Sequence, residues 1–113
     1  MKDKVYIITR EETTYEYLLG IKNVVAVEKT IINNTVYGTR DEARAYLCEE
    51  FQKEMPQFID EGGNLMGCDD EWMKSGGLKK TETRTTSQDT IYKIVELAVS
   101  HAILNQSDAI LTH

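Results

Sequence analysis

Apolar residues occupy both alternations of the first segment, from Val5 to Ile8. Such a run is typical of a strand that lies inside a sheet or is covered on both faces. The pattern therefore predicts a first strand over residues 3–9 and a second over residues 24–32. Asn33-Asn34 favours a tight reversal, which predicts a hairpin into residues 35–37. Residues 11–22 allow either a helical turn or a ragged strand, interrupted by Gly20.

A helix is predicted to begin at Arg40, because Thr39 and Glu42 have the spacing of a capping box. Apolar residues then recur every four positions, which places them on one face of the helix: Ala43, Leu47, Phe51 and Met55. Pro56 lacks the amide that the helix would need next, so the helix should end near Met55.

A second helix is predicted from about Gln88 to Leu104, capped by Thr86 or Ser87. Its apolar positions cover most of its circumference: Ile91, Ile94, Val95, Leu97, Ala98, Val99, Ala102, Ile103 and Leu104. Such a helix needs cover on more than one side. We therefore expect a homo-oligomer through the helix at 88–104, the alternative being the central core helix of a monomer. Residues 105–113 are expected to form a C-terminal tail.

Residues 62–87 combine glycines, charges and a Thr-rich run without an apolar period, which predicts a long charged loop. The chain has 113 residues, 41% hydrophobic and 28% charged, a composition typical of a single domain. The expected fold class is α+β, with one domain over residues 1–113. A small, mainly antiparallel sheet from the N-terminal half should be packed by the helices at 40–55 and 88–104.

The formal charge of -6 disfavours generic nucleic-acid binding, because that affinity depends largely on neutralising phosphates. Residues 40–72 hold ten acidic and three basic residues, so the whole acidic excess lies in the middle third. The sequence has neither a long hydrophobic stretch nor a small-residue cleavage site. We expect a cytoplasmic protein that does not enter a membrane.

Groups that commonly carry out catalysis are scarce. The two histidines are His101, expected within the second helix, and the terminal His113. Cys48 and Cys68 stand 20 residues apart, each without a close Cys or His partner, which disfavours a zinc site. We expect Cys48 to be a small core residue on the first helix and Cys68 a loop thiol. The sequence thus predicts a non-enzymatic protein with no metal and no cofactor.

The segment from Gly76 to Ser87 has the features of an anion site. Glycine amides, cations and hydroxyls precede an expected helix N-terminus, a combination that suits a phosphate group. The predicted phosphate ligands are Lys79, Lys80, Arg84, Thr85, Thr86 and Ser87. Trp72 and Tyr92 are the candidates for stacking on a base. The alternative is a flexible solvated loop.

An acidic face is the second candidate interface, formed by Asp69, Asp70, Glu71 and the adjacent Trp72. Carboxylates around an aromatic side chain suit a basic groove on a partner protein. Solvation explains the carboxylates equally well, but it does not explain Trp72.

The stretch from Val36 to Leu47, together with Val5 to Thr9, resembles a pattern common in small uncharacterised accessory proteins of bacteriophages and prophages. The resemblance implies a counter-defence protein that acts by binding. Some proteins of that kind block a nucleic-acid-guided nuclease with an acidic face, and others sequester cyclic nucleotide signals. We therefore expect a phage-encoded inhibitor of a bacterial defence system, acting in the host cytoplasm on a cyclic nucleotide or a defence protein. The alternatives are a small oligomeric regulatory or structural subunit and a small enzyme.

Overall fold

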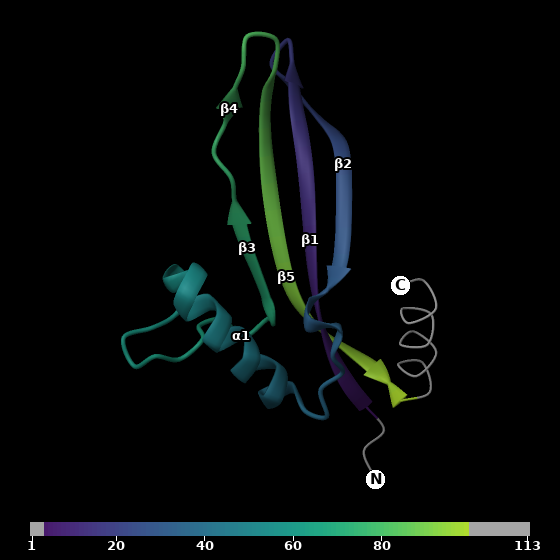
Figure 1. Cartoon of the computed structure of the whole chain (residues 1–113), viewed down its shortest axis with the longest axis vertical. Helices are drawn as coiled ribbons and strands as arrows, with labels where there is room; N and C mark the ends of the chain where they lie inside the picture. Colours follow the sequence, from purple (N-terminus) through teal and green to yellow (C-terminus); the bar gives the residue numbers. More distant parts are fainter. Residues whose placement is uncertain (1–3, 100–113) are drawn as a thin grey trace.

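The computed structural model describes residues 4–99, which form a mainly antiparallel sheet and one α-helix (Figure 1). The fold is therefore of mixed α and β type. In chain order the elements are β1 (Lys4–Leu18), β2 (Ile21–Ile31), the 3-10 turn η1 (Ile32–Asn34), α1 (Arg40–Glu54), the 3-10 turn η2 (Pro56–Phe58), β3 (Glu71–Ser75), β4 (Lys79–Lys80) and β5 (Thr85–Ala98). No helix within residues 4–99 is long and apolar enough to span a membrane.

The first and last strands lie side by side at the centre of the sheet. The strand order is β2-β1-β5-β3, and β4 also pairs with β5. β1 and β5 pair in an unbroken antiparallel register from Lys4 opposite Ala98 to Glu16 opposite Thr86. The sheet is thus not confined to the N-terminal half of the chain, because its central pairing joins the two ends of the described segment.

The predicted helix at 88–104 is wrong over its first part, because Thr85–Ala98 is strand β5. Ile91, Ile94 and Val95 fit one face of a helix, but β-branched residues also favour a strand. Pairing with β1 along almost its whole length resolves that ambiguity in favour of the strand. The remainder of the predicted helix, from Ser100, and the tail at 105–113 lie outside the described residues.

The ambiguous segment at 11–22 continues β1 to Leu18 and turns into β2 at Leu19-Gly20. Both turn residues have positive φ, 51° and 79°, as a two-residue hairpin loop requires. The hairpin predicted at Asn33-Asn34 is wrong. Both asparagines do have positive φ, but the chain after them crosses to β1, where Tyr37 forms an isolated bridge with Tyr6.

Helix α1 confirms the predicted start and apolar face. The Thr39 hydroxyl accepts a hydrogen bond from the Glu42 amide at 3.1 Å, and the Glu42 carboxylate accepts one from the Gly38 amide at 3.2 Å. The four residues of the predicted stripe are all buried: Ala43, Leu47, Phe51 and Met55. The helix ends at Glu54, immediately before the Met55-Pro56 step.

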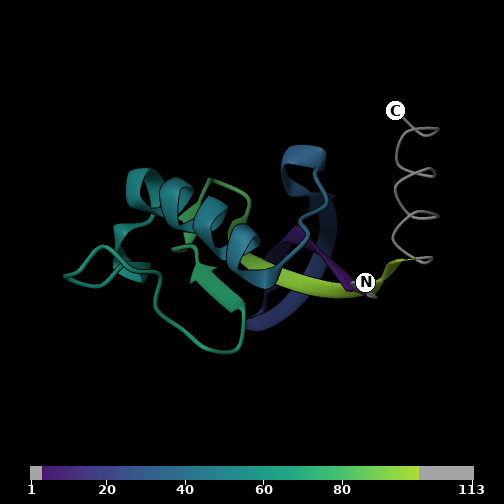
Figure 2. The same cartoon turned by 90° about the horizontal axis from the view of Figure 1, so that it is seen from below.

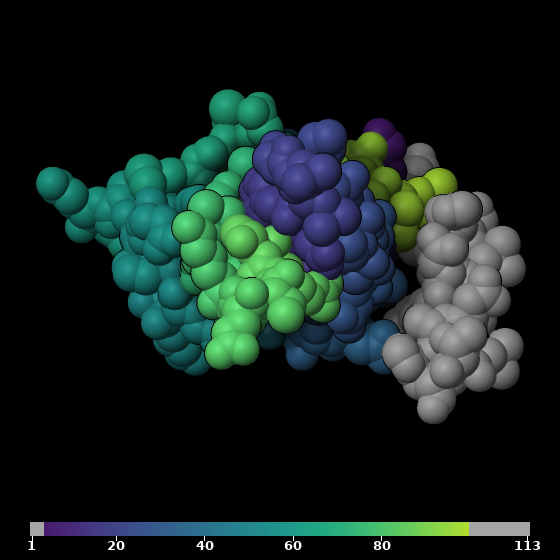
Figure 3. All heavy atoms as spheres, turned by 90° about the horizontal axis from the view of Figure 1, so that it is seen from above, coloured from purple at the N-terminus to yellow at the C-terminus, as the bar shows by residue number. Residues whose placement is uncertain are grey.

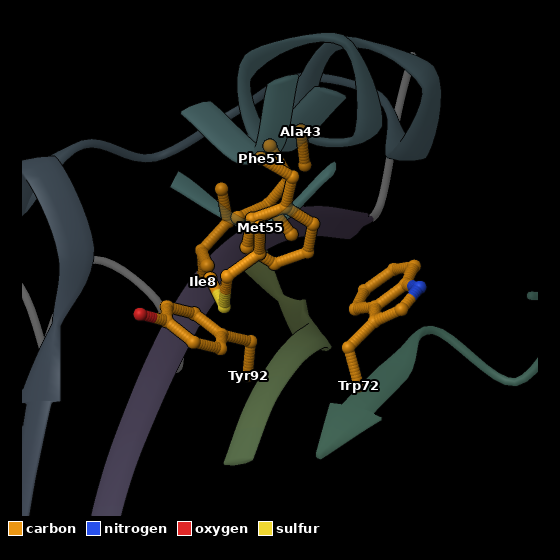
Figure 4. Close-up of a cluster of buried hydrophobic side chains, with 7 residues drawn as sticks. Ile8, Ala43, Phe51, Met55, Trp72 and Tyr92 are labelled. Carbon is orange, nitrogen blue, oxygen red and sulfur yellow. The ribbon is translucent and has the colours of Figure 1, made fainter. Parts of the chain in front are cut away.

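The core lies between α1 and the end of the sheet where β1 begins (Figures 1 and 4). Phe51 is its centre, because its ring meets Trp72 and Tyr92 edge-on at centroid distances of 5.9 and 5.1 Å. Ile8 is fully buried beneath the same cluster. These contacts tie α1 to β1, β3 and β5 at once.

The predicted loop at 62–87 is wrong in part, because it contains β3, β4 and the start of β5. β3 runs beside β5, with Trp72 opposite Tyr92, and extends the sheet by one strand. Figure 2 shows α1 lying across one face of a curved sheet. In Figure 1 the helix accompanies only the lower part of the strands, and the upper part extends beyond it.

Candidate anion-binding site

The face of the sheet that packs against α1 changes character along the strands. On β1 this face carries Ile8 and then, at every second position, Arg10, Glu12, Thr14 and Glu16. On β5 the residues opposite them run from buried Tyr92 through Thr90 and Gln88 to Thr86. The face is therefore apolar beneath α1 and polar beyond it.

A pocket of about 480 Å³ lies on this polar part of the face. Strands β1, β3, β4 and β5 and the link between β3 and β4 all contribute to its walls: Arg10, Thr14, Lys74, Gly76, Gly77, Lys79, Thr86, Ser87, Gln88 and Thr90. The β register explains why residues distant in sequence meet here, since Lys74 lies opposite Thr90 and Lys79 opposite Thr86.

Gly76 allows the link between β3 and β4 to lie against β5. Its amide donates a hydrogen bond to the Gln88 carbonyl at 2.7 Å. A Cβ atom at this position would lie 2.3 Å from the same oxygen, so any other residue would displace the link. The neighbouring Gly77 has open space at its Cβ position and needs no such approach.

The cations at and beside the pocket differ in the ion pairs that they make within the described residues. Arg10 pairs with Glu12, and Arg84 pairs with Glu16. Within residues 4–99, Lys74 and Lys79 are exposed and make no ion pair. Both ammonium groups are therefore available to an anion that enters the pocket.

The structure brings together part of the predicted phosphate site. Lys79, Thr86 and Ser87 line the pocket. The Ser87 hydroxyl, however, is hydrogen-bonded to the Tyr17 hydroxyl at 3.2 Å. Since Lys80 lies opposite Thr85, one position out of step with Lys79 and Thr86, those two side chains belong to the other face of the sheet.

The structure overturns one other element of that prediction and places Arg84 outside the pocket. The expected helix N-terminus does not exist, because Thr85–Ala98 is a strand whose residues from Thr86 onward pair with β1. Arg84 also does not line the pocket, since its guanidinium pairs with Glu16. The amide that does approach the site belongs to Gly76, and it is already bonded to Gln88.

The two proposed stacking residues are core residues. Trp72 is 4% exposed, and its indole N–H donates to the Met66 carbonyl at 2.7 Å. Tyr92 is 8% exposed, and burial raises the pKa of its phenol, although nearby Arg10 lowers it in part. Trp72 is therefore explained by packing, and it is not available to stack on a base.

The predicted acidic face is likewise divided by the fold. Asp69 and Glu71 are exposed, but Asp70 is 8% exposed and points to α1. Its carboxylate accepts from Arg44 Nη1 at 2.7 Å and pairs with Arg40 Nε at 2.8 Å. With Trp72 also buried, two of the four predicted contact residues hold the fold together.

Both cysteines are free thiols. Cys48 lies on α1, where its thiol donates to the Gly63 carbonyl at 3.2 Å, and Cys68 is an exposed loop residue. Among residues 4–99 there is no group of three or more His, Cys, Asp or Glu that would hold a metal ion.

Sequence reasoning missed the contributions of Arg10, Thr14 and Lys74 to the pocket. The run of polar residues from Arg10 to Thr14 is consistent with a solvated strand, but residues 11–22 also allow a helical turn. Lys74 joins the site only through the pairing of β3 with β5, which is not visible in the local pattern.

No protein-family model, curated protein or solved structure matches this chain.

Proposed function

We propose that this chain is a non-enzymatic binding protein that holds a phosphate-bearing ligand on the open half of its sheet. The observation that carries the proposal is the pocket in which Lys74 and Lys79 lie among threonine hydroxyls without an acidic partner in the described part of the chain. Its volume of about 480 Å³ falls within the range of small-molecule sites.

The chemistry of the walls supports binding in preference to turnover. Cations and hydroxyls are the groups that a phosphate requires. None of the residues that line the pocket is a His, Cys, Asp or Glu, the side chains that most often act as acid, base or nucleophile. We therefore expect a ligand that is bound without being converted, and a nucleotide is the phosphate-bearing ligand that we expect.

The resemblance to phage accessory proteins gives this proposal a biological setting. In it, the chain acts in the cytoplasm of a bacterial host and sequesters a nucleotide signal of a defence system. The blocking of a defence protein through an acidic face has less support, since Asp70 and Trp72 are both engaged inside the fold.

The direct test is a thermal-shift and calorimetric titration at low salt with inorganic pyrophosphate and a panel of linear and cyclic nucleotides. We expect at least one member to stabilise the protein, with an affinity that falls as salt is raised. The double variant Lys74→Ala/Lys79→Ala should abolish the effect. Lys80→Ala is the matched control, because its side chain belongs to the other face of the same strand.

Two results would contradict the proposal: no binding of any member of the panel at low salt, or an equal loss of binding in the Lys80→Ala control. Either would show that the charge of the pocket does not select a ligand.

A second candidate function is assembly into oligomers, which we infer at strand β2 instead of the predicted helix. β2 is one edge of the sheet, and its middle is exposed and uncharged from Val24 to Val27. An uncovered edge of this kind favours pairing with a strand of a second copy. Light scattering after size exclusion tests this candidate: we expect a dimer that Val25→Lys converts to a monomer, and a monomeric parent protein would remove the candidate.

A further inference from the structure

The polar half of the sheet face repeats one arrangement of three side chains at the anion pocket. Residues that lie directly opposite one another on antiparallel strands share a face, and β3 and β4 both lie beside β5 (Figure 1). Two rows across the sheet therefore contain a glutamate on β1, a threonine on β5 and a lysine on β3 or β4. They are Glu12, Thr90 and Lys74 in the first row, and Glu16, Thr86 and Lys79 in the second.

The lysine and the threonine of each row have no side-chain partner within residues 4–99. Lys74 and Lys79 form no ion pair there. The hydroxyls of Thr86 and Thr90 form no hydrogen bond with the described residues. All four residues line the pocket. Since a phosphate accepts hydrogen bonds from ammonium and hydroxyl groups, each row offers one pair of donors to one phosphate.

The glutamate of each row does not compete with such a phosphate for the lysine. Glu12 and Glu16 lie on β1, on the other side of β5 from the lysines, and each pairs with an arginine: Arg10 with Glu12, and Arg84 with Glu16. The Gln88 side-chain amide also donates to Glu12, at 3.3 Å. The two arginine charges therefore offset the repulsion that the carboxylates would exert on a bound anion.

The two rows are widely spaced. Thr86 and Thr90 stand four residues apart on β5, which is roughly 13 Å at the usual rise of a strand. Between the rows, the Gln88 carbonyl binds the amide of Gly76, a residue without a side chain to fill the gap. Flexible lysine stems can lean toward each other and shorten the distance. Two phosphates that share a bridging oxygen are nevertheless too close together to use both rows, whereas phosphates separated by a sugar suit them.

We propose that the anion pocket has two phosphate subsites, Lys74 with Thr90 and Lys79 with Thr86, and that its ligand carries two phosphates separated by a sugar. This inference rests on the proposed function, since it states which class of phosphate-bearing ligand that site takes. A dinucleotide, linear or cyclic, is the nucleotide class that has phosphates of this kind. AMP has one phosphate, and the two phosphates of ADP are adjacent.

The experiment compares AMP, ADP, the dinucleotide ApA and its 5′-phosphorylated form pApA by calorimetry on the full chain at low salt. ADP and pApA carry about the same charge near neutral pH, so this pair isolates the spacing of the phosphates. ApA reports what a second nucleoside adds without a second phosphate. We expect pApA to bind at least tenfold more tightly than either ADP or ApA. Tenfold corresponds to about 1.4 kcal/mol, the order of one hydrogen bond to a charged group.

Single lysine variants test whether each row holds one phosphate. Lys74→Ala and Lys79→Ala should each reduce the affinity for pApA to that for ADP, because either change removes one of the two subsites. The same variants should change ADP binding only about twofold, because ADP can use the row that remains. Lys80→Ala is the matched control and should change neither affinity, since its side chain belongs to the other face of the sheet.

The threonine hydroxyls are tested by substitutions that keep the branched shape of the side chain. Thr86→Val and Thr90→Val should each weaken pApA binding at least threefold. Thr85→Val is the matched control, because this neighbour on β5 points to the other face and lies opposite Lys80.

Each outcome decides between the inference and the proposed function. If ADP binds through Lys74 and Lys79 but pApA binds no more tightly than ADP or ApA, the two subsites are wrong and the anion pocket stands. If one lysine variant abolishes the binding of every ligand and the other changes nothing, the pocket has a single phosphate site, and the inference is overturned. If neither pyrophosphate nor any nucleotide binds, the proposed function fails, and this inference fails with it.

Discussion

The Asp70 carboxylate is the main polar attachment between α1 and the segment that leads into β3. The side chain of Asp70 is 10% exposed, and its carboxylate lies between Arg40 and Arg44, at 2.8 and 2.7 Å. Asp70→Asn removes the charge and keeps the shape. Asn also tolerates the positive φ of 54° at this position, so the substitution adds little backbone strain.

The expected cost follows from what each arginine retains. Arg44 also donates to the carbonyls of Leu65 and Gly67, both at 3.0 Å, so it is not left without acceptors. The Arg40 side chain is 56% exposed and can return to water, which makes its share small. The main loss in the variant is therefore one partly buried charge-assisted contact, between Asp70 and Arg44, and this loss should lower the free energy of unfolding by about 2 kcal/mol. That is roughly 8 °C in Tm for a domain of this size.

The assay is urea unfolding followed by Trp72 fluorescence, because this single tryptophan packs beside Arg44, whose guanidinium lies 5.5 Å from the ring centroid. Asp69→Asn is the control, since it removes the same charge from an exposed neighbour, and its effect should stay within about 0.5 kcal/mol. Arg44→Gln should cost more than Asp70→Asn, and Arg40→Gln less. Equal stabilities of the Asp70→Asn and Asp69→Asn proteins would refute the assignment of this carboxylate as the link.

Three further predictions follow from single positions. Leu19 is fully exposed and has a φ of 51°, so Leu19→Asn should raise the free energy of unfolding of the protein by about 1 kcal/mol. A thermal melt would detect this as a higher Tm, and a lower Tm would contradict the turn geometry. Gly76→Ala should cost about 1–3 kcal/mol in urea unfolding and also abolish pyrophosphate binding, because its Cβ meets the Gln88 carbonyl, whereas Gly77→Ala should do neither. Burial raises the pKa of Tyr92 in the folded state, so its contribution to stability is intact below the ordinary value of 10.0 and is lost as pH rises above it; Tyr92→Phe should show a smaller loss of stability between pH 9 and pH 11, and an unchanged loss would oppose the assignment.

The elements that were predicted correctly are those whose signals are local. Thr39 and Glu42 fix the start of α1, Pro56 fixes its end, and the stripe through Phe51 identifies the buried face. Each signal depends on neighbours within one or two helical turns. The sequence therefore contains all that is needed to place this helix.

The strand β5 was missed because its decisive partner lies far away in the sequence. The apolar residues between Ile91 and Val95 fit both the helical period and the strand period. Whether this segment forms a helix or a strand depends on the hydrogen bonds that β1 offers. Trp72 was misplaced for the same reason. It looked like an exposed aromatic residue among acids until β3 paired with β5 and brought it beside Phe51.

The anion pocket shows the same division. The local motif of glycines, lysines and threonines from Gly76 to Ser87 predicts one wall of the pocket, including Lys79 and Thr86. Arg10, Thr14 and Lys74 come from two other strands, and only the register of the sheet brings them to the same place. A local motif can thus nominate a ligand chemistry, but the fold decides which of its residues take part.

The uncovered half of the sheet is best understood from where the polarity of its face changes. On β1 the change falls between Ile8 and Arg10, and on β5 it falls one pair further along, between Tyr92 and Thr90, because Arg10 lies opposite Tyr92. Both strands therefore become polar within two successive pairs of this face, and the open face exposes charges and hydroxyls instead of apolar surface. A face that only awaited a packing partner would have stayed apolar. Figure 3 views the molecule from the free end of this face, where the β4–β5 turn and the tip of the β1–β2 hairpin lie. The polar composition of the face, with Lys74 and Lys79 free of ion pairs within residues 4–99, is what a small anionic ligand would require.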